Sequence, residues 1–161
     1  MADLFVAPFD LSRLPEIAPE FVGKNPVPYT RATQRQKWTE SFKKYPRWCN
    51  ALRACFGAAV PASVSVRNAE GEDIAAVAYL GPLVHPILLR KEHKRALICS
   101  VRTEIVWKDE SHADADNVHK AVLDALFAND KLVNRHRVTS DYGDEAQMTV
   151  TIEIRPRGPQ D

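Results

Sequence analysis

Two aspartates set two positions apart, with a lysine one helical turn later, are the residues of this sequence best suited to chemistry. Asp114 and Asp116 would project from the same side of an extended chain, because successive side chains of a strand alternate between its faces. Paired carboxylates are ligands for a hard divalent cation such as Mg²⁺. Lys120 follows four residues after Asp116 and places a positive charge beside the pair. The spacing predicts a metal site; the competing interpretation is a helix cap and turn residues alone.

The acidic pair lies between a predicted strand and a predicted helix. Apolar and polar residues alternate over residues 96–107, which indicates a strand with one buried face. Apolar residues recur three and four positions apart over residues 118–126, as in an amphipathic helix that Asp116 or Asn117 would cap. The strand therefore delivers the chain to the acidic pair, and the helix carries Lys120.

Three more residues near the pair are candidate metal ligands. Asp130 follows the predicted helix, at the expected start of the next strand, and is placed to return a third carboxylate to the site. His112 continues the alternation toward Asp114, and His119 lies one helical turn from Asp116. Imidazole is a poor ligand for Mg²⁺, so we expect neither histidine among the ligands.

The rest of the chain predicts one small α/β (α+β) domain, with a mixed β-sheet packed against two main helices. Residues 1–19 are expected to form a surface arm, and residues 20–22 a short strand before a proline-limited loop. A helix should begin after Thr30 or Thr33 and extend to Cys55, with Pro46 breaking or kinking it. The strands expected over 131–139 and 147–154 should pair as a hairpin, and residues 156–161 should form a flexible tail.

Charge is distributed unevenly along the 161 residues, although the formal net charge is only +1. Residues 31–53 carry seven basic residues and one acidic residue, whereas residues 109–130 carry six acidic residues and one basic residue. A metal-dependent enzyme that acts on a polyanion needs both regions, one for phosphates and one for cations. Three cysteines without a paired motif, no secretory amino terminus and no apolar run long enough for a membrane span lead us to expect a cytoplasmic protein.

The acidic stretch resembles a known family signature. The run Asp-Ala-Asp-Asn-Val-His-Lys-Ala-Val-Leu-Asp-Ala-Leu over residues 114–126, followed by Asn129-Asp130, is similar to the D-x-D-N-x-x-K-x-x-x-D-A-L signature of the RusA family of Holliday-junction resolvases. Upstream, Gly-Lys-Asn-Pro-Val-Pro at 23–28 is similar to the G-K-P-x-P loop that opens many members. The resemblance covers about 20–55 and 95–155, within an expected endonuclease domain of 20–155 in which residues 56–94 are expected to be an insertion.

The resemblance implies a homodimer of small subunits that cuts four-way DNA junctions by paired symmetric nicks with Mg²⁺, or Mn²⁺ as the alternative ion. A two-fold dimer suits such a substrate because it presents two identical sites. Asp114, Asp116 and Asp130 would be the metal ligands and Lys120 the essential lysine, so that these four residues are catalytic. Asp141, Asp144 and Glu145 are the substitutes for Asp130.

DNA would be held by basic residues of the predicted helix and of the strand that follows Asp130. The residues predicted to bind DNA are Arg31, Arg35, Lys37, Lys43, Lys44, Arg135 and Arg137. A plain solvated helix face is the alternative interpretation of the first five. Two other functions stay open: a RusA-like DNA-binding module without catalysis, and a metal-dependent nuclease acting on other branched DNA or on nucleotides.

Overall fold

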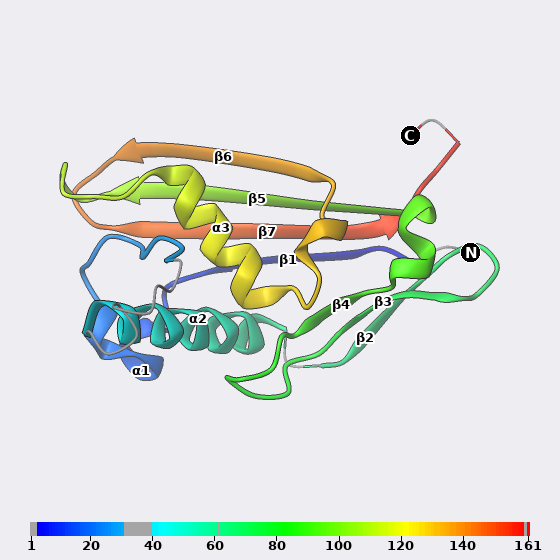
Figure 1. Cartoon of the computed structure of the whole chain (residues 1–161), viewed down its shortest axis with the longest axis horizontal. Helices are drawn as coiled ribbons and strands as arrows, with labels where there is room; N and C mark the ends of the chain where they lie inside the picture. The colour runs from blue at the N-terminus through cyan, green and yellow to red at the C-terminus, as the bar shows by residue number, and fades with distance from the viewer. Residues whose placement is uncertain (1–2, 31–39, 61, 160) are drawn as a thin grey trace.

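The computed structural model describes residues 3–30, 40–60, 62–159 and 161, which form two sheets with helices packed on one face of the larger sheet (Figure 1). The larger sheet has the strand order β1-β7-β5-β6, and the smaller antiparallel sheet has the order β2-β3-β4. The strands are β1 (Phe5–Asp10), β2 (Val64–Arg67), β3 (Asp73–Val77), β4 (Ile87–Leu89), β5 (Leu97–Trp107), β6 (Arg135–Tyr142) and β7 (Gln147–Pro156). The helices are α1 (Leu14–Ile17), α2 (Glu40–Ala59) and α3 (Ala115–Leu126), with 3-10 turns η1 (Pro19–Phe21), η2 (Lys91–Ala96) and η3 (Asp130–Leu132). The predicted mixed α/β domain is confirmed.

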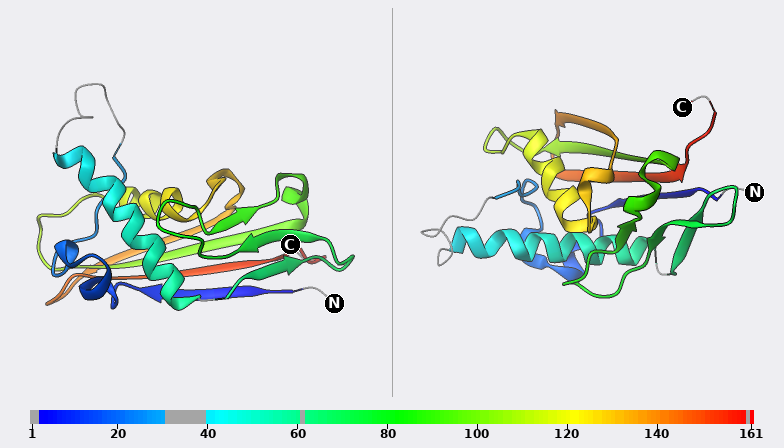
Figure 2. Two further views of the ribbon diagram at one scale, coloured as in Figure 1. Left: turned by 90° about the horizontal axis from the view of Figure 1, so that it is seen from below. Right: turned by 45° about the vertical axis from the view of Figure 1, so that its right-hand side comes forward.

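Strand β5 is the centre of the larger sheet and delivers the chain to the acidic pair. Its predicted buried face is confirmed: Leu97, Cys99, Val101, Thr103, Ile105 and Trp107 are all at most 2% exposed. The alternate residues Arg102 and Glu104 are exposed on the other face and form an ion pair of 3.0 Å. Helices α2 and α3 therefore cover only one face of this sheet (Figure 2).

The predicted hairpin between the last two strands is wrong. β5 lies between β6 and β7, pairing in parallel with β6 and antiparallel with β7. β7 is an interior strand between β1 and β5, and its inward residues, from Met148 to Ile154, are at most 1% exposed and belong to the core. β6 is mostly polar and exposed, which suits the edge of the sheet. Helix α3 is the crossover that makes β5 and β6 parallel.

The predicted surface arm is also wrong, because residues 5–10 form strand β1 at the other edge of the sheet. Phe5, Ala7 and Phe9 alternate and are buried, and the Phe9 ring meets the edge of Phe56 on α2 at 5.7 Å. Burial of this alternating apolar face outweighs Pro8, which is tolerated in an edge strand. The short strand expected at residues 20–22 is replaced by the 3-10 turn η1.

Helix α2 continues through Pro46, so the break that was one of the two predicted effects of this proline does not occur. Proline removes one backbone hydrogen bond and crowds the preceding turn, but burial of Trp48, Leu52 and Phe56 in the core stabilises the helix. The helix was predicted to start after Thr30 or Thr33. Residues 31–39, which contain both predicted starts, lie outside the described part of the chain. No helix among the described residues is long and apolar enough to cross a membrane.

Candidate active site

Asp114 and Asp116 lie at the amino end of α3, at the point where the chain leaves β5. Asp114 has extended backbone angles and is the N-cap: its Oδ1 accepts a hydrogen bond from the Asp116 amide at 3.1 Å. The predicted cap, Asp116 or Asn117, is therefore wrong, since these residues lie two and three positions after Asp114, inside the helix. Both aspartates are exposed, and their charge suits the positive end of the helix dipole.

Lys120 lies on the next turn of α3 and is held by an aromatic ring that the sequence did not single out. Its Nζ lies 4.5 Å from the centroid of the Tyr29 ring, within the range of a cation–π contact. The Tyr29 amide donates to the Asn117 carbonyl at 2.8 Å, which fixes the ring over the first turns of α3. Tyr29 also meets the edge of Tyr45 on α2 at 5.6 Å. The chain thus positions the Lys120 ammonium above the acidic turn.

Asn25 fastens the loop at residues 23–30 to the segment that precedes the acidic pair. Its Oδ1 accepts from the Lys108 amide at 2.9 Å, and its Nδ2 donates to Asp109 Oδ1 at 3.0 Å and to the Ser111 carbonyl at 3.1 Å. Gly23 enters the loop with a φ of 72°, a conformation that favours glycine. The Gly-Lys-Asn-Pro-Val-Pro stretch therefore has a structural role: through Asn25 it holds residues 108–111, which lead to the acidic pair.

A side-chain hydrogen bond also joins α2 to α3. Tyr45 donates its hydroxyl hydrogen to Asp124 Oδ2 at 2.6 Å. Burial, followed by the bond to Asp124, raises the pKa of Tyr45 well above its ordinary value, so the phenol stays protonated. This contact fixes α2, which carries Lys43 and Lys44, relative to α3, which carries the acidic pair.

His119 is buried and faces the sheet, where it links buried Thr103 to exposed His136 by hydrogen bonds. The His119 Nδ1 lies 2.7 Å from Thr103 Oγ1, its Nε2 lies 3.0 Å from His136 Nδ1, and His136 Nε2 lies 3.2 Å from the Val133 carbonyl. A carbonyl can only accept, so His136 donates from Nε2, His119 donates to His136, and Thr103 donates to His119. Burial, reinforced by His136, lowers the pKa of His119 to about 4. A neutral histidine used in this way is not directed at a cation.

His112 is also engaged within the protein. Its ring stacks on Trp107 with centroids 4.0 Å apart. Its Nδ1 donates to the Ala113 carbonyl at 2.7 Å, so its Nε2 accepts from the Tyr142 hydroxyl at 2.7 Å. Both ring nitrogens are occupied, which fixes the approach of the chain to Asp114.

The structure does not bring Asp130 to the acidic pair. Asp130 begins η3, beyond the carboxyl end of α3, and a helix of 12 residues is about 18 Å long. Asp141 lies at the end of β6 nearer the pair, on the sheet face opposite to α3 by alternation with His136. Asp144 and Glu145 line a separate cavity of about 590 Å³ with Lys24 and Lys108. Among the described residues, no three His, Cys, Asp or Glu side chains are grouped to hold a metal.

The residues predicted to bind DNA fall on two surfaces. Lys43 and Lys44 are exposed on α2, next to Tyr45 and hence close to the Tyr29–Lys120 pair. Arg135 and Arg137 lie on the open face of the larger sheet, where a cavity of about 330 Å³ is also lined by Arg102. The Asp161 carboxylate contacts Arg135 there at 3.3 Å. Arg31, Arg35 and Lys37 lie outside the described residues.

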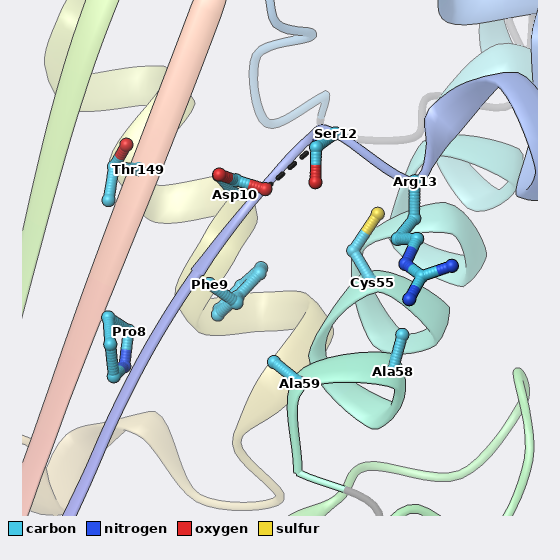
Figure 3. A pocket seen from close by; sticks show the side chains of 9 residues that line it. All are labelled: Pro8, Phe9, Asp10, Ser12, Arg13, Cys55, Ala58, Ala59 and Thr149. Atoms are coloured by element: carbon cyan, nitrogen blue, oxygen red, sulfur yellow. Dashed lines mark hydrogen bonds between the residues drawn. The ribbon is translucent and has the colours of Figure 1, made fainter.

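A third cavity, of about 340 Å³, lies between β1 and the end of α2 (Figure 3). Its charged lining residues are Asp10 and Arg13. Asp10 accepts from the Ser12 amide at 3.0 Å, and hydrogen bonding to Ser12 lowers the pKa of its carboxyl. The Asp10 carboxylate therefore accepts a hydrogen bond within its own turn, and no second carboxylate lines the cavity. Chemistry is therefore better assigned to the start of α3.

Together, the fold and the site define a class: a small mixed α/β protein with two carboxylates and a lysine on the first turns of a β-α-β crossover helix, and exposed lysines on the adjacent helix. A family model described as endodeoxyribonuclease RusA matches residues 25–153. The chain therefore belongs to the RusA endodeoxyribonuclease family, a family of enzymes that cut DNA, and the predicted membership is confirmed. The comparison with curated proteins found no match.

Proposed function

We propose that this protein is a Mg²⁺-dependent, structure-specific endonuclease that resolves four-way DNA junctions by paired symmetric nicks. One observation carries the proposal: a chain of the RusA family presents Asp114, Asp116 and Lys120 together, and exposed, on the first turns of α3. The competing assignment, a helix cap alone, accounts for Asp114 but not for Asp116 or for the ammonium group beside it.

The donor set fits a magnesium ion, with Mn²⁺ as the alternative. Asp114 uses Oδ1 in the helix cap and keeps its second oxygen for a ligand, while no described residue donates a hydrogen bond or forms an ion pair with the Asp116 carboxylate. Magnesium is commonly held by one or two carboxylates, with waters and substrate phosphate oxygens completing the shell. When bound, the ion would lower the pKa of a coordinated water and offset charge on the phosphate.

The surrounding residues orient this chemistry. The Lys120 ammonium, held over Tyr29, offsets negative charge that develops on the phosphoryl oxygens. The amino end of α3 adds the positive end of the helix dipole, which favours an anionic phosphate at the same place. Asn25 and the bound loop limit the movement of the segment before Asp114, so that the carboxylates keep their positions when DNA binds.

We propose that DNA approaches along α2. Lys43 and Lys44 lie on the turn that contains Tyr45, and this tyrosine touches Tyr29, which in turn touches Lys120. Phosphate contacts from these lysines would position the backbone without reading its sequence. Arg135 and Arg137 would then meet a different part of the DNA, because they lie on the opposite face of the sheet.

Cleavage of a synthetic four-way junction tests this function. Wild-type protein should nick two opposed strands symmetrically with Mg²⁺ and none with EDTA, and Asp116→Asn should lose the activity. Glu110→Gln is the matched control, since Glu110 is an exposed acidic residue of the same segment outside the proposed site. Full activity in Asp116→Asn would overturn the proposal, as would nicking that does not need a divalent ion.

A second candidate is a junction-binding protein without catalysis, and the structure offers one observation in its favour. Among the described residues, no third carboxylate joins Asp114 and Asp116. This alternative predicts binding that is insensitive to Mg²⁺ and falls steeply with salt, without strand scission. Side-by-side assays on junction, flap and duplex DNA would also separate a junction enzyme from a nuclease with another branched substrate.

A further inference from the structure

Four arginines lie on the face of the larger sheet that α2 and α3 leave uncovered. They are Arg102 on β5, Arg135 and Arg137 on β6, and Arg155 on β7. These positions share one face because the paired strands are in register and side chains alternate along each strand. The proposed function gives a role to Arg135 and Arg137, and leaves Arg155 without one.

The guanidinium group of Arg155 is bound end-on by the Asp161 carboxylate. Arg155 Nη1 donates to Asp161 Oδ2 at 2.6 Å, and Arg155 Nη2 donates to Asp161 Oδ1 at 2.8 Å. Glu153 lies on the other side of the guanidinium, 3.4 Å from Nε, so the two terminal nitrogens are directed at Asp161. Hydrogen bonds from Arg155 and from the Gly158 amide, which donates at 2.7 Å, hold the pKa of Asp161 well below its usual range. The carboxylate is therefore ionised at neutral pH.

The same carboxylate reaches across the sheet to a second arginine. Asp161 Oδ1 lies 3.3 Å from Arg135 Nη2. Arg155 is on β7 and Arg135 is on β6, with β5 between these strands, so the carboxylate lies over β5 (Figure 1). Ile98 of β5 pairs in register with Arg155 and points to this open face, yet it is only 1% exposed and lies outside the main core. The Asp161 segment and the two arginines therefore cover this position of β5.

We propose that Arg155 and Arg135 form a binding site for a DNA phosphate, and that Asp161 occupies this site until DNA displaces it. The inference deepens the proposed nuclease function and rests on it for the ligand. Carboxylates and phosphates both offer two oxygens to the planar guanidinium group, so an arginine that binds a carboxylate through two nitrogens is arranged to bind a phosphate in the same way. Asp161 thus holds the place of a phosphate group in the DNA-free protein.

Few contacts within the described residues hold the Asp161 segment besides these arginines. The Arg157 amide donates to the Ala96 carbonyl at 2.7 Å, and the Asp161 amide donates to the Gly158 carbonyl at 3.2 Å within the same turn. None of residues 157–159 is buried, so the segment can leave the arginines without opening the core.

The arginines beyond Arg135 favour DNA as the competing anion. Arg135 also lines the cavity of about 330 Å³ that contains Arg102 and Arg137. A DNA backbone that reaches the site therefore meets further arginines on the same face, whereas Asp161 offers a single carboxylate. A polyanion that contacts several cations at once also releases several counterions, which strengthens its binding.

Fluorescence anisotropy of a labelled four-way junction in EDTA measures DNA binding separately from cleavage. Asp161→Asn should raise the association constant of the full chain roughly fivefold, because both arginines are freed for one phosphate. The slope of log K against log salt concentration should steepen by about 0.9, the contribution of one more neutralised phosphate. Asp141→Asn is the matched control: Asp141 lies on the same sheet face, and among the described residues its carboxylate accepts only the Tyr142 amide. This control should leave the slope unchanged.

The gain in affinity should depend on the two arginines. In a protein that also carries Arg135→Gln and Arg155→Gln, Asp161→Asn should raise the affinity no more than Asp141→Asn does. An equal gain with and without the arginines would overturn the site, because loss of a negative charge at long range would then explain it. An unchanged salt slope in Asp161→Asn alone would overturn it as well.

This inference and the proposed nuclease function can fail separately, because binding is measured without a divalent ion. If the variants show these differences but the protein does not cut junctions, the phosphate site stands and the nuclease function falls. If the protein cuts junctions but the variants bind as wild type does, only the phosphate site falls.

Discussion

Asp114 has two roles in this account, helix cap and metal ligand, and two substitutions separate them. Asparagine retains an oxygen for the cap but loses the negative charge, whereas alanine loses both. Because Asp114 Oδ1 accepts the Asp116 amide at 3.1 Å, Asp114→Ala should lower the free energy of unfolding by about 1 kcal/mol for the cap, and by about 0.5 kcal/mol more for the helix dipole. Asp114→Asn should lose only the dipole contribution.

The two Asp114 variants should differ in stability but not in activity. Loss of one metal ligand removes roughly 3 kcal/mol of transition-state stabilisation, about 100-fold in rate, so that Asp114→Asn and Asp114→Ala should be equally impaired on a four-way junction. Urea denaturation and single-turnover cleavage measure the two effects. Asp116→Asn is the control that should lose activity with little loss of stability, because the Asp116 side chain caps nothing.

Two results would refute this reasoning. If Asp114→Asn is as unstable as Asp114→Ala, the oxygen that the structure places at the helix end is not what stabilises it. If Asp114→Asn cleaves junctions at the wild-type rate with Mg²⁺, then Asp114 is a cap and nothing more. The first result would leave the ligand assignment intact, and the second would leave the cap intact.

Three further predictions concern the residues around the acidic pair. Tyr29→Ala should slow junction cleavage about two- to fivefold, because the cation–π contact that holds Lys120 is worth about 0.5–1 kcal/mol. Tyr29→Phe keeps the ring and should cleave at the wild-type rate, so equal losses in both variants would contradict this role. A histidine in the unfolded chain has a pKa of 6.5, whereas His119 in the folded protein has a pKa of about 4. Lowering the pH therefore protonates the unfolded state first, and the free energy of unfolding should fall by about 1.5 kcal/mol between pH 6.5 and 5. Urea denaturation at both pH values should show a smaller fall in the free energy of unfolding for His119→Gln than for wild type. An equal fall in the two proteins would contradict this role of His119. Tyr45→Phe should cost about 1–2 kcal/mol in thermal unfolding because Asp124 loses its donor at 2.6 Å, and an unaltered melt would count against that bond.

The local features of the site could be predicted from residue types and their spacing. The acidic pair and Lys120 can be recognised from spacing alone because all three lie on the first turns of one helix. The extended chain expected to carry both carboxylates is wrong, since Asp114 caps α3 and Asp116 lies inside it. The alternation in β5 likewise predicted which of its residues are buried. These are short-range relations, and the family signature over the same residues reinforced them.

Which segments lie side by side depends on long-range packing and could not be predicted from local patterns. Strands β6 and β7 are adjacent in sequence, and the short turn between them predicted a hairpin, but β7 pairs with β1 and β5, and β6 pairs with the other side of β5. The same arrangement sets Asp130 at the far end of α3 from Asp114, and brings Tyr29 from a distant loop to Lys120. No local sequence pattern predicts these distances, because they depend on how the strands pair and how the helices pack on the sheet.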